Sequence, residues 1–130
     1  MKLHHVGVAT SSIAKHAEQY RRAFAIGLTS EIIDDELQKV RVAFAEVGDG
    51  VSIEFVEPLG DDSPISNLLK RGGGVYHICY LVPDIEAAIE QVRQAGGLIV
   101  SGPLPARAFN NRRIAFVYTQ DRSLVEFLEE

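Results

Sequence analysis

The sequence predicts an α+β protein of two tandem βαβββ modules whose strands form a curved mixed sheet. Three observations support this fold class: the chain matches itself at a fixed offset, each half starts with a strand-like run before a helical pattern, and three extended stretches complete each half. The 130 residues are typical of one domain. We therefore expect a single domain over residues 1–130, with a first module at about 1–58, a linker at 59–76 and a second module at about 77–130.

The internal repeat has an offset of 72 residues and contains no gap. Residues 5–58 align with residues 77–130, and 13 of these 54 pairs are identical, where composition alone would give roughly three. The identical pairs carry polar as well as apolar residues, among them His5 and His77, Arg41 and Arg113, Phe44 and Phe116, Glu54 and Glu126, and Glu57 and Glu129. The repeat therefore predicts two copies of the same structural unit.

The first module has the pattern of one strand, one helix and three strands. Residues 5–9 form a short apolar run, and Ser11 and Ser12 can cap a helix. Apolar residues then recur at helical spacing from Ile13 to Phe24. Extended stretches are expected at about 28–33, 39–47 and 51–57, the last two joined by a hairpin turn.

The second module repeats this order after the linker. A strand is expected at 77–81 and a helix after Asp84, with the helix ending at Gly96-Gly97. Extended stretches follow at about 98–102, 111–119 and 123–129. Within the linker we expect a short helix from about Pro64 to Lys70 and a hinge at three glycines, residues 72–74.

Charge and composition exclude several classes of protein. Eighteen acidic residues against 13 basic ones give a formal net charge of −5, which opposes binding to nucleic acid. No apolar run is long enough to span a membrane, and the first residues lack the apolar core of a signal peptide. The single cysteine, Cys79, cannot form an internal disulfide. We expect a cytoplasmic protein with no nucleic-acid or membrane partner.

Four side chains of metal-ligand type occupy equivalent places in the two modules. His5 and His77 lie on the first strands, and Glu54 and Glu126 lie on the last strands between bulky apolar neighbours. A carboxylate in the middle of a strand is costly to bury unless a cation accompanies it. Two imidazoles and two carboxylates suit Ni²⁺, Co²⁺, Zn²⁺ or Mn²⁺. A single strand histidine is more often a hydrogen-bonded core residue, but the duplication of both ligand types favours a metal site.

Two further features lie near these positions in the sequence. Arg112 and Arg113, preceded by Asn111, could bind a carboxylate or phosphate of the substrate, and Arg113 shares its face with the small residue Ala115. The alternative is a solvated strand edge. Cys79 follows His77 by two residues and could border the metal site, although a strand cysteine is usually a small core residue.

These motifs resemble the vicinal oxygen chelate superfamily over the whole chain. The stretches that carry the resemblance are Leu3-His4-His5-Val6-Gly7-Val8-Ala9, Val51-Ser52-Ile53-Glu54, Tyr76-His77-Ile78-Cys79-Tyr80 and Leu124-Val125-Glu126-Phe127. The sequence is most similar to the glyoxalase I and methylmalonyl-CoA epimerase families, whose metal ligands match His5, Glu54, His77 and Glu126. The resemblance implies a divalent metal ion, a glutathione- or CoA-type thiol conjugate as substrate, and a homodimer. The two modules could pair within one chain or across the dimer.

The resemblance implies an enzyme that moves a proton next to a carbonyl group. The leading expectation is a glyoxalase I-like lyase, the alternative is methylmalonyl-CoA epimerase, and a metal-free drug-sequestering protein of the same fold is a third possibility. Glu126, or else Glu54, is the expected base. Some epimerases carry an extra acid on the strand that matches residues 39–43, where this chain has none. The turn at 120–123 also departs from that of typical glyoxalases.

Overall fold

The computed structural model describes residues 1–130, which form two compact units. The first unit is residues 5–76, and the second unit is residues 77–130 together with residues 1–4. Each unit contains one strand, one helix and three further strands in that order, so the predicted α+β class and the two βαβββ modules are confirmed.

The helices and strands follow each other along the chain as predicted, with one additional 3₁₀ turn. In chain order they are β1 (Lys2–Ala9), α1 (Ile13–Phe24), β2 (Ile33–Asp35), β3 (Val40–Gly48), β4 (Val51–Pro58), α2 (Ser66–Lys70), β5 (Gly74–Val82), α3 (Ile85–Gln94), β6 (Leu98–Ala106), η1 (Arg107–Phe109), β7 (Arg112–Tyr118) and β8 (Leu124–Glu129).

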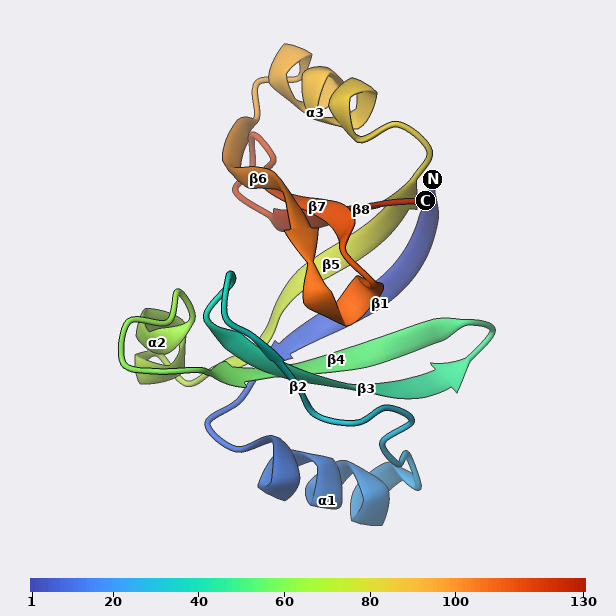
Figure 1. Ribbon diagram of the computed structural model, residues 1–130, viewed down its shortest axis with the longest axis vertical. Helices are drawn as coiled ribbons and strands as arrows, with labels where there is room; N and C mark the ends of the chain where they lie inside the picture. The colour runs from blue at the N-terminus through green and yellow to red at the C-terminus, as the bar shows by residue number, and fades with distance from the viewer. The chain divides into compact units, whose positions relative to one another are not determined.

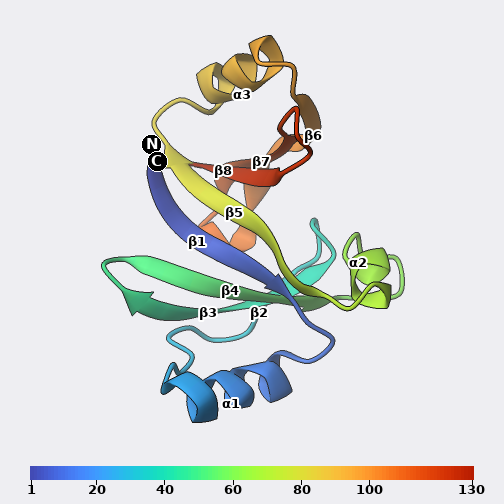
Figure 2. The same ribbon diagram turned by 180° about the vertical axis from the view of Figure 1, so that it is seen from behind.

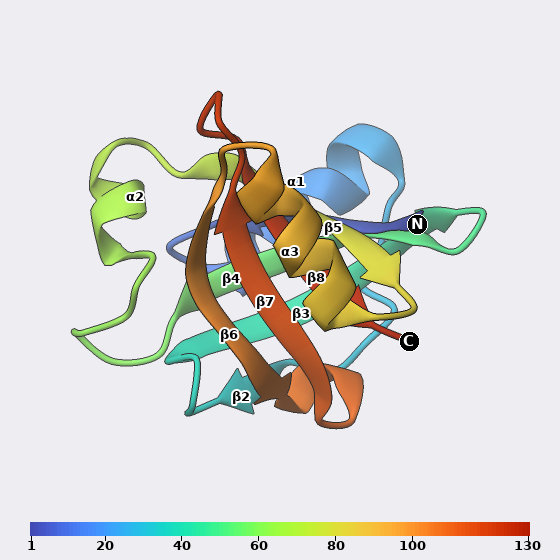
Figure 3. The ribbon, with the colours of Figure 1, turned by 90° about the horizontal axis from the view of Figure 1, so that it is seen from above.

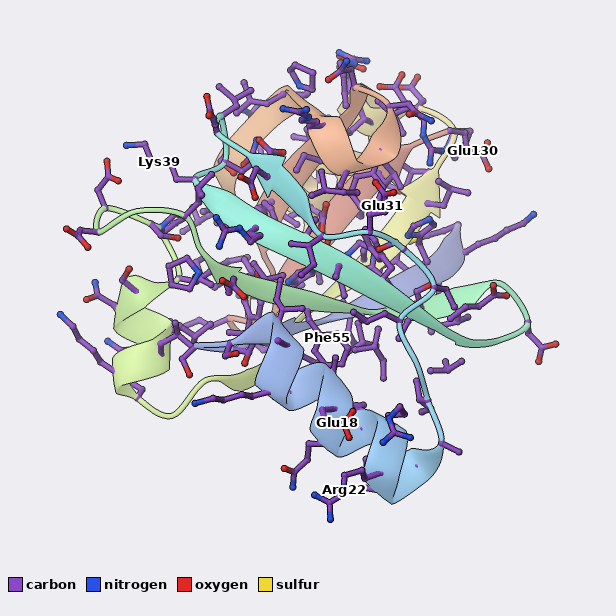
Figure 4. The ribbon with its side chains drawn as sticks, turned by 60° about the horizontal axis from the view of Figure 1, so that its bottom comes forward. Glu18, Arg22, Glu31, Lys39, Phe55 and Glu130 are labelled. Carbon is purple, nitrogen blue, oxygen red and sulfur yellow. The ribbon has the colours of Figure 1, made fainter.

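The sheet of the first unit has the strand order β2-β3-β4-β1. β1 runs parallel to β4, whereas β3 is antiparallel to both β2 and β4. α1 covers one face of these strands (Figure 1), and the core between helix and sheet includes Ile13, Ala43 and Phe55, all completely buried. Figure 4 shows Phe55 between β4 and α1, while Glu18 and Arg22 point away from the sheet. The opposite face of this sheet is not covered by α1.

The sheet of the second unit repeats this arrangement with the order β5-β8-β7-β6. β5 is parallel to β8, and β7 is antiparallel to β6 and β8. α3 lies across β7 and β8 (Figure 3), and its core includes Ile85, Ala115 and Phe127. These three residues are the repeat equivalents of Ile13, Ala43 and Phe55. The repeat in the sequence is therefore a repeat in packing.

Both long helices begin at the predicted caps. The Ser12 side chain accepts a hydrogen bond from the Lys15 amide at 3.2 Å, and the Asp84 side chain accepts one from the Ala87 amide at 3.0 Å. Each cap satisfies one of the amides that the first turn of a helix leaves unpaired. The longer of the two helices, α1, has 12 residues, and no helix of the structure combines the length and the apolar character needed to cross a membrane.

β1 and β5 each begin three residues earlier than predicted, at Lys2 and Gly74, and the larger differences from the prediction are in β2 and β6. β2 begins at Ile33 rather than near residue 28, because the amides of Thr29 and Ser30 both bond the Phe44 carbonyl and hold this segment as a loop. β6 continues past residue 102 to Ala106 in spite of two prolines. Proline lacks the amide donor of a ladder but is tolerated on an edge strand, and β6 ends the strand order of its sheet. The short linker helix is present as α2, between β4 and β5 (Figure 2).

Candidate functional site

The first unit brings together one of the predicted histidine and glutamate pairs. His5 Nε2 and Glu54 Oε1 lie 3.5 Å apart, and the two residues are 0% and 5% exposed. Parallel pairing of β1 with β4 sets Glu54 beside Gly7 and His5 beside Ser52. Because Gly7 has no side chain, the Glu54 carboxylate has room to reach diagonally toward the imidazole.

The second unit contains the equivalent pair in a tighter form. His77 Nε2 and Glu126 Oε2 lie 2.9 Å apart, and both residues are 2% exposed. In the parallel pairing of β5 with β8, the register partner of Glu126 is Cys79, which is completely buried. Cys79, which the sequence indicates could border the site, lies beside the glutamate in this register.

Each glutamate projects from the face of its sheet that carries no helix. Phe55 and Phe127, the next residues along the chain, belong to the cores beneath α1 and α3. Successive side chains of a strand point to opposite faces, so Glu54 and Glu126 point away from these helices. The predicted alternation of the last strands is therefore confirmed.

A phenylalanine contacts the histidine of each pair, a neighbour that is not predicted from the sequence. Phe44 lies across from Glu54 and contacts the His5 ring edge-on, with centroids 5.9 Å apart. Phe116 lies across from Glu126 and contacts the His77 ring edge-on at 5.3 Å. Phe44 and Phe116 are an identical pair of the repeat, which is the signal that could have marked them.

The donor set of each pair fits a divalent metal ion. An imidazole nitrogen and a carboxylate oxygen face each other, and both are the ligand types that Zn²⁺, Ni²⁺, Co²⁺ and Mn²⁺ accept. The alternative is an ion pair with a protonated histidine, which would leave each unit with a buried charge pair of little net benefit. Duplication of the same buried pair in both units favours the metal.

Arg113 does not lie on the face that carries Glu126. Its guanidinium donates to Glu86 of α3 at 2.6 and 3.1 Å and to Glu129 of β8 at 2.8 Å. The space expected beside Ala115 is absent, because α3 packs against that residue and leaves it 0% exposed. Hydrogen bonds to Glu86 and Glu129 raise the pKa of Arg113, and the same contact lowers the pKa of Glu86. Arg113 thus belongs to an ion-pair cluster with Glu86 and Glu129, and its expected role in anion binding stays a prediction.

The other two residues of the predicted anion site are placed differently. Arg112 is exposed and donates a hydrogen bond to the Phe109 carbonyl at 3.3 Å. It directly precedes Arg113 on β7, so the two side chains point to opposite faces of the sheet. Strand alternation puts Arg112 on the same face as Phe116 and Glu126. Asn111 has a positive φ of 62° in the turn before β7, and its backbone amide donates a hydrogen bond to the Ala106 carbonyl. Arg112 is therefore the arginine on the glutamate face.

The first unit has its own version of the Arg113 cluster. Arg41 donates to Asp34 at 2.7 Å and to Glu57 at 3.2 Å. Glu57 also accepts the backbone amide of Ile13, the first residue of α1, at 2.8 Å. The carboxylate at the end of β4 thus ties the strand to the start of the helix, where the helix dipole favours negative charge.

Comparison with known proteins shows relatives over nearly the whole chain. An ethylmalonyl-CoA/methylmalonyl-CoA epimerase of Cereibacter sphaeroides is 30% identical over 122 residues, which cover 92% of this chain and 90% of the relative. The crystal structure of methylmalonyl-CoA epimerase from Mycobacterium tuberculosis has a TM-score of 0.84 with 29% identity, covering 98% of this chain and 87% of that one. A methylmalonyl-CoA epimerase solved with methylmalonyl-CoA and NH₄⁺ has a TM-score of 0.84 and 26% identity, covering 99% and 94%.

These relatives are epimerases, so they support the alternative drawn from the sequence better than the leading expectation of a glyoxalase I-like lyase. The family comparison covers more than half of the chain: residues 4–116 match the glyoxalase/bleomycin resistance protein/dioxygenase superfamily. Enzymes of this superfamily typically use a divalent metal ion, in agreement with the donor types of the two pairs. The chain belongs to this superfamily, the vicinal oxygen chelate group that its motifs resemble.

Proposed function

We propose that this protein is an epimerase that inverts the α-carbon of a methylmalonyl-CoA-type thioester. The similarity to named epimerases over more than nine-tenths of the chain carries this proposal. The two buried pairs of histidine and glutamate supply the ligand types and carboxylates that such a reaction needs. A CoA thioester is accordingly the proposed substrate class.

The residues that would hold the metal are His5, Glu54, His77 and Glu126, acting together on one ion. Each unit contributes one imidazole and one carboxylate, which is why we propose a single shared site rather than two separate ones. A divalent ion bound there would polarise the thioester carbonyl and stabilise the negative charge that develops when the α-proton leaves.

Glu126 is the proposed base. Its carboxylate would take the α-proton, giving a carboxylic acid and an enolate. The same carboxylic acid would return the proton to the opposite face of the α-carbon once the enolate has turned in the site, which completes the inversion and restores the carboxylate. Glu54 remains the alternative base, because its environment has the same histidine and phenylalanine neighbours.

Arg112 is the proposed contact for an anionic part of the substrate. It is exposed, it lies on the glutamate face of β7, and a guanidinium binds carboxylate and phosphate oxygens well. Asn111 precedes it in the turn and adds a polar side chain at the same end of the strand.

A homodimer is also proposed. β6 is at the end of its sheet and exposes Leu98 and Val100, and an apolar edge strand favours association with a second copy. Light scattering at micromolar concentration measures the assembly directly, and a monomer would contradict this part of the proposal.

The function is tested with metal-reconstituted protein and methylmalonyl-CoA in deuterated water. Epimerisation should introduce deuterium at the α-carbon, as measured by mass spectrometry of the thioester. A parallel reaction with methylglyoxal and glutathione tests the lyase activity first expected from the sequence. Deuterium exchange without lactoylglutathione formation supports the epimerase, and the reverse result would overturn it.

A further inference from the structure

Phe44 and Phe116 each lie directly opposite the glutamate of their own unit. Phe44 pairs with Glu54 in the register of β3 and β4, and Phe116 pairs with Glu126 in the register of β7 and β8. Directly opposed side chains of antiparallel strands share one face, with Cβ atoms about 4.5–5.5 Å apart. Each ring is therefore an immediate neighbour of a carboxylate that the proposed reaction uses.

The same rings contact the histidines. The ring planes of Phe44 and His5 meet at 75°, and those of Phe116 and His77 meet at 85°. Such T-shaped contacts set the orientation of one ring relative to the other. Each phenylalanine thus lies opposite the glutamate of its unit and contacts the histidine of the same unit.

Part of each ring remains accessible. Ala43 and Ala115, the preceding residues, are 0% exposed beneath the helices, whereas Phe44 and Phe116 are only half-buried on the opposite face. A residue that served only to fill a core would be buried to the same degree as these alanines. The accessible ring surface beside each carboxylate suits a short alkyl group of a substrate.

We propose that Phe44 and Phe116 determine substrate specificity by limiting the length of the alkyl group on the α-carbon of an acyl thioester. The inference rests on the proposed function, which brings the α-carbon next to a glutamate. A phenyl ring neither accepts nor donates the transferred proton, so its effect is on the fit of the substituent. One methylene in an apolar pocket typically changes kcat/KM by about 10–200-fold.

Ethylmalonyl-CoA and methylmalonyl-CoA, both named for the Cereibacter sphaeroides relative, differ by this one methylene. The test compares kcat/KM for the two thioesters in Phe44→Leu and Phe116→Leu. Leucine keeps each position apolar but removes the ring, so the ratio of ethylmalonyl-CoA to methylmalonyl-CoA turnover should rise about tenfold in at least one variant.

Phe55→Leu and Phe127→Leu are the matched controls. Each changes the same residue type one position beyond a glutamate, but on the helix-covered face of the sheet. These variants should lower stability and leave the substrate ratio unchanged. An equal change of the ratio in the control variants would show that the effect comes from weakened packing and would overturn the assignment.

A binding measurement separates this inference from the proposed function. Propionyl-CoA and butyryl-CoA carry the same two alkyl groups without the malonyl carboxylate, and calorimetry gives their relative affinities without turnover. If the wild-type protein exchanges no α-proton, the epimerase proposal fails, yet a shift toward butyryl-CoA in Phe44→Leu or Phe116→Leu still supports the role of the rings. An unchanged ratio in both variants overturns that role, and absence of all thioester binding overturns both proposals.

Discussion

Cys79 is the register partner of Glu126 on the parallel strands β5 and β8, whereas the equivalent partner of Glu54 is Gly7. A buried thiol is therefore the neighbour of Glu126 on β5, whereas the equivalent neighbour of Glu54 on β1 is a glycine without a side chain. The repeat preserves the ligand types but changes this neighbour. We expect the two glutamates to contribute unequally to the reaction, which the following substitutions test.

Glu126→Gln should reduce deuterium exchange into methylmalonyl-CoA by about 10²–10⁴-fold, the usual cost of removing a general base. The amide keeps an oxygen ligand, so the metal content should fall much less than the activity. Metal analysis and exchange kinetics on the same samples measure both quantities. Glu54→Gln is the matched comparison, and a larger loss of activity in that variant at equal metal content would move the base to the first unit.

His5→Ala and His77→Ala should weaken metal binding to similar degrees. Each removes one imidazole from an equivalent pair, and we expect at least the 10–100-fold loss of affinity that is typical even of residues supporting metal ligands. Titration with Co²⁺ or Zn²⁺ measures the affinity and should give about one ion per chain. His16→Ala is the control because His16 lies on α1. Tight metal retention in the double variant of His5 and His77 would contradict the assignment.

Arg112→Ala and Arg113→Ala should have separate effects. Loss of Arg112 should raise KM for the CoA thioester about tenfold, the typical result of losing one charged hydrogen bond. Loss of Arg113 should leave KM unchanged and lower the melting temperature slightly, because this residue bonds Glu86 and Glu129 in an exposed cluster. Thermal unfolding and steady-state kinetics distinguish the two, and a raised KM in Arg113→Ala would restore the anion site first expected there.

The pH dependence of stability should contain a contribution from His16. Its ring packs against Tyr20 and Phe55, with centroids 5.2 and 5.3 Å away, and burial lowers its pKa below the usual 6.5. The unfolded chain therefore takes up the proton first as pH falls, so this contribution is complete above about pH 6.5 and is lost as pH falls toward the folded pKa.

His16→Phe retains an aromatic ring at this position and removes the titration. The difference in unfolding free energy between about pH 7.5 and about pH 5.5 should be smaller in this variant than in the wild type. Chemical denaturation at the two pH values gives both differences. Equal differences in the two proteins would show that His16 titrates identically in the folded and unfolded chains.

The sequence was sufficient to predict the features that depend on local pattern. The helix caps at Ser12 and Asp84, and the placement of Glu54 and Glu126 on the sheet face away from the helices, follow from periodicity and from the repeat. Features that depend on packing between distant segments were not predictable. Arg113 was correctly placed on the face of Ala115, but the sequence did not show that α3 covers this face. The extent of β6 depends on its place at the end of the strand order, where prolines are tolerated.

The two phenylalanines show the same limit of prediction from sequence. Phe44 and Phe116 were visible as an identical pair of the repeat, but the pattern of one strand does not tell which residue lies opposite on the next strand. Register, which is set by turn geometry and by the whole sheet, supplied the pairing with Glu54 and Glu126. Repeat identity therefore marks candidate residues, and register assigns their partners.

The hydrogen bond from the Ile13 backbone amide to the Glu57 carboxylate couples the start of α1 to β4. Glu54 is three residues before Glu57 on the same strand, so a displacement of the start of α1 acts on the strand that holds this carboxylate. A binder raised against the outer surface of α1, around Glu18 and Arg22, would accordingly act on Glu54 through β4 rather than by direct contact (Figure 4).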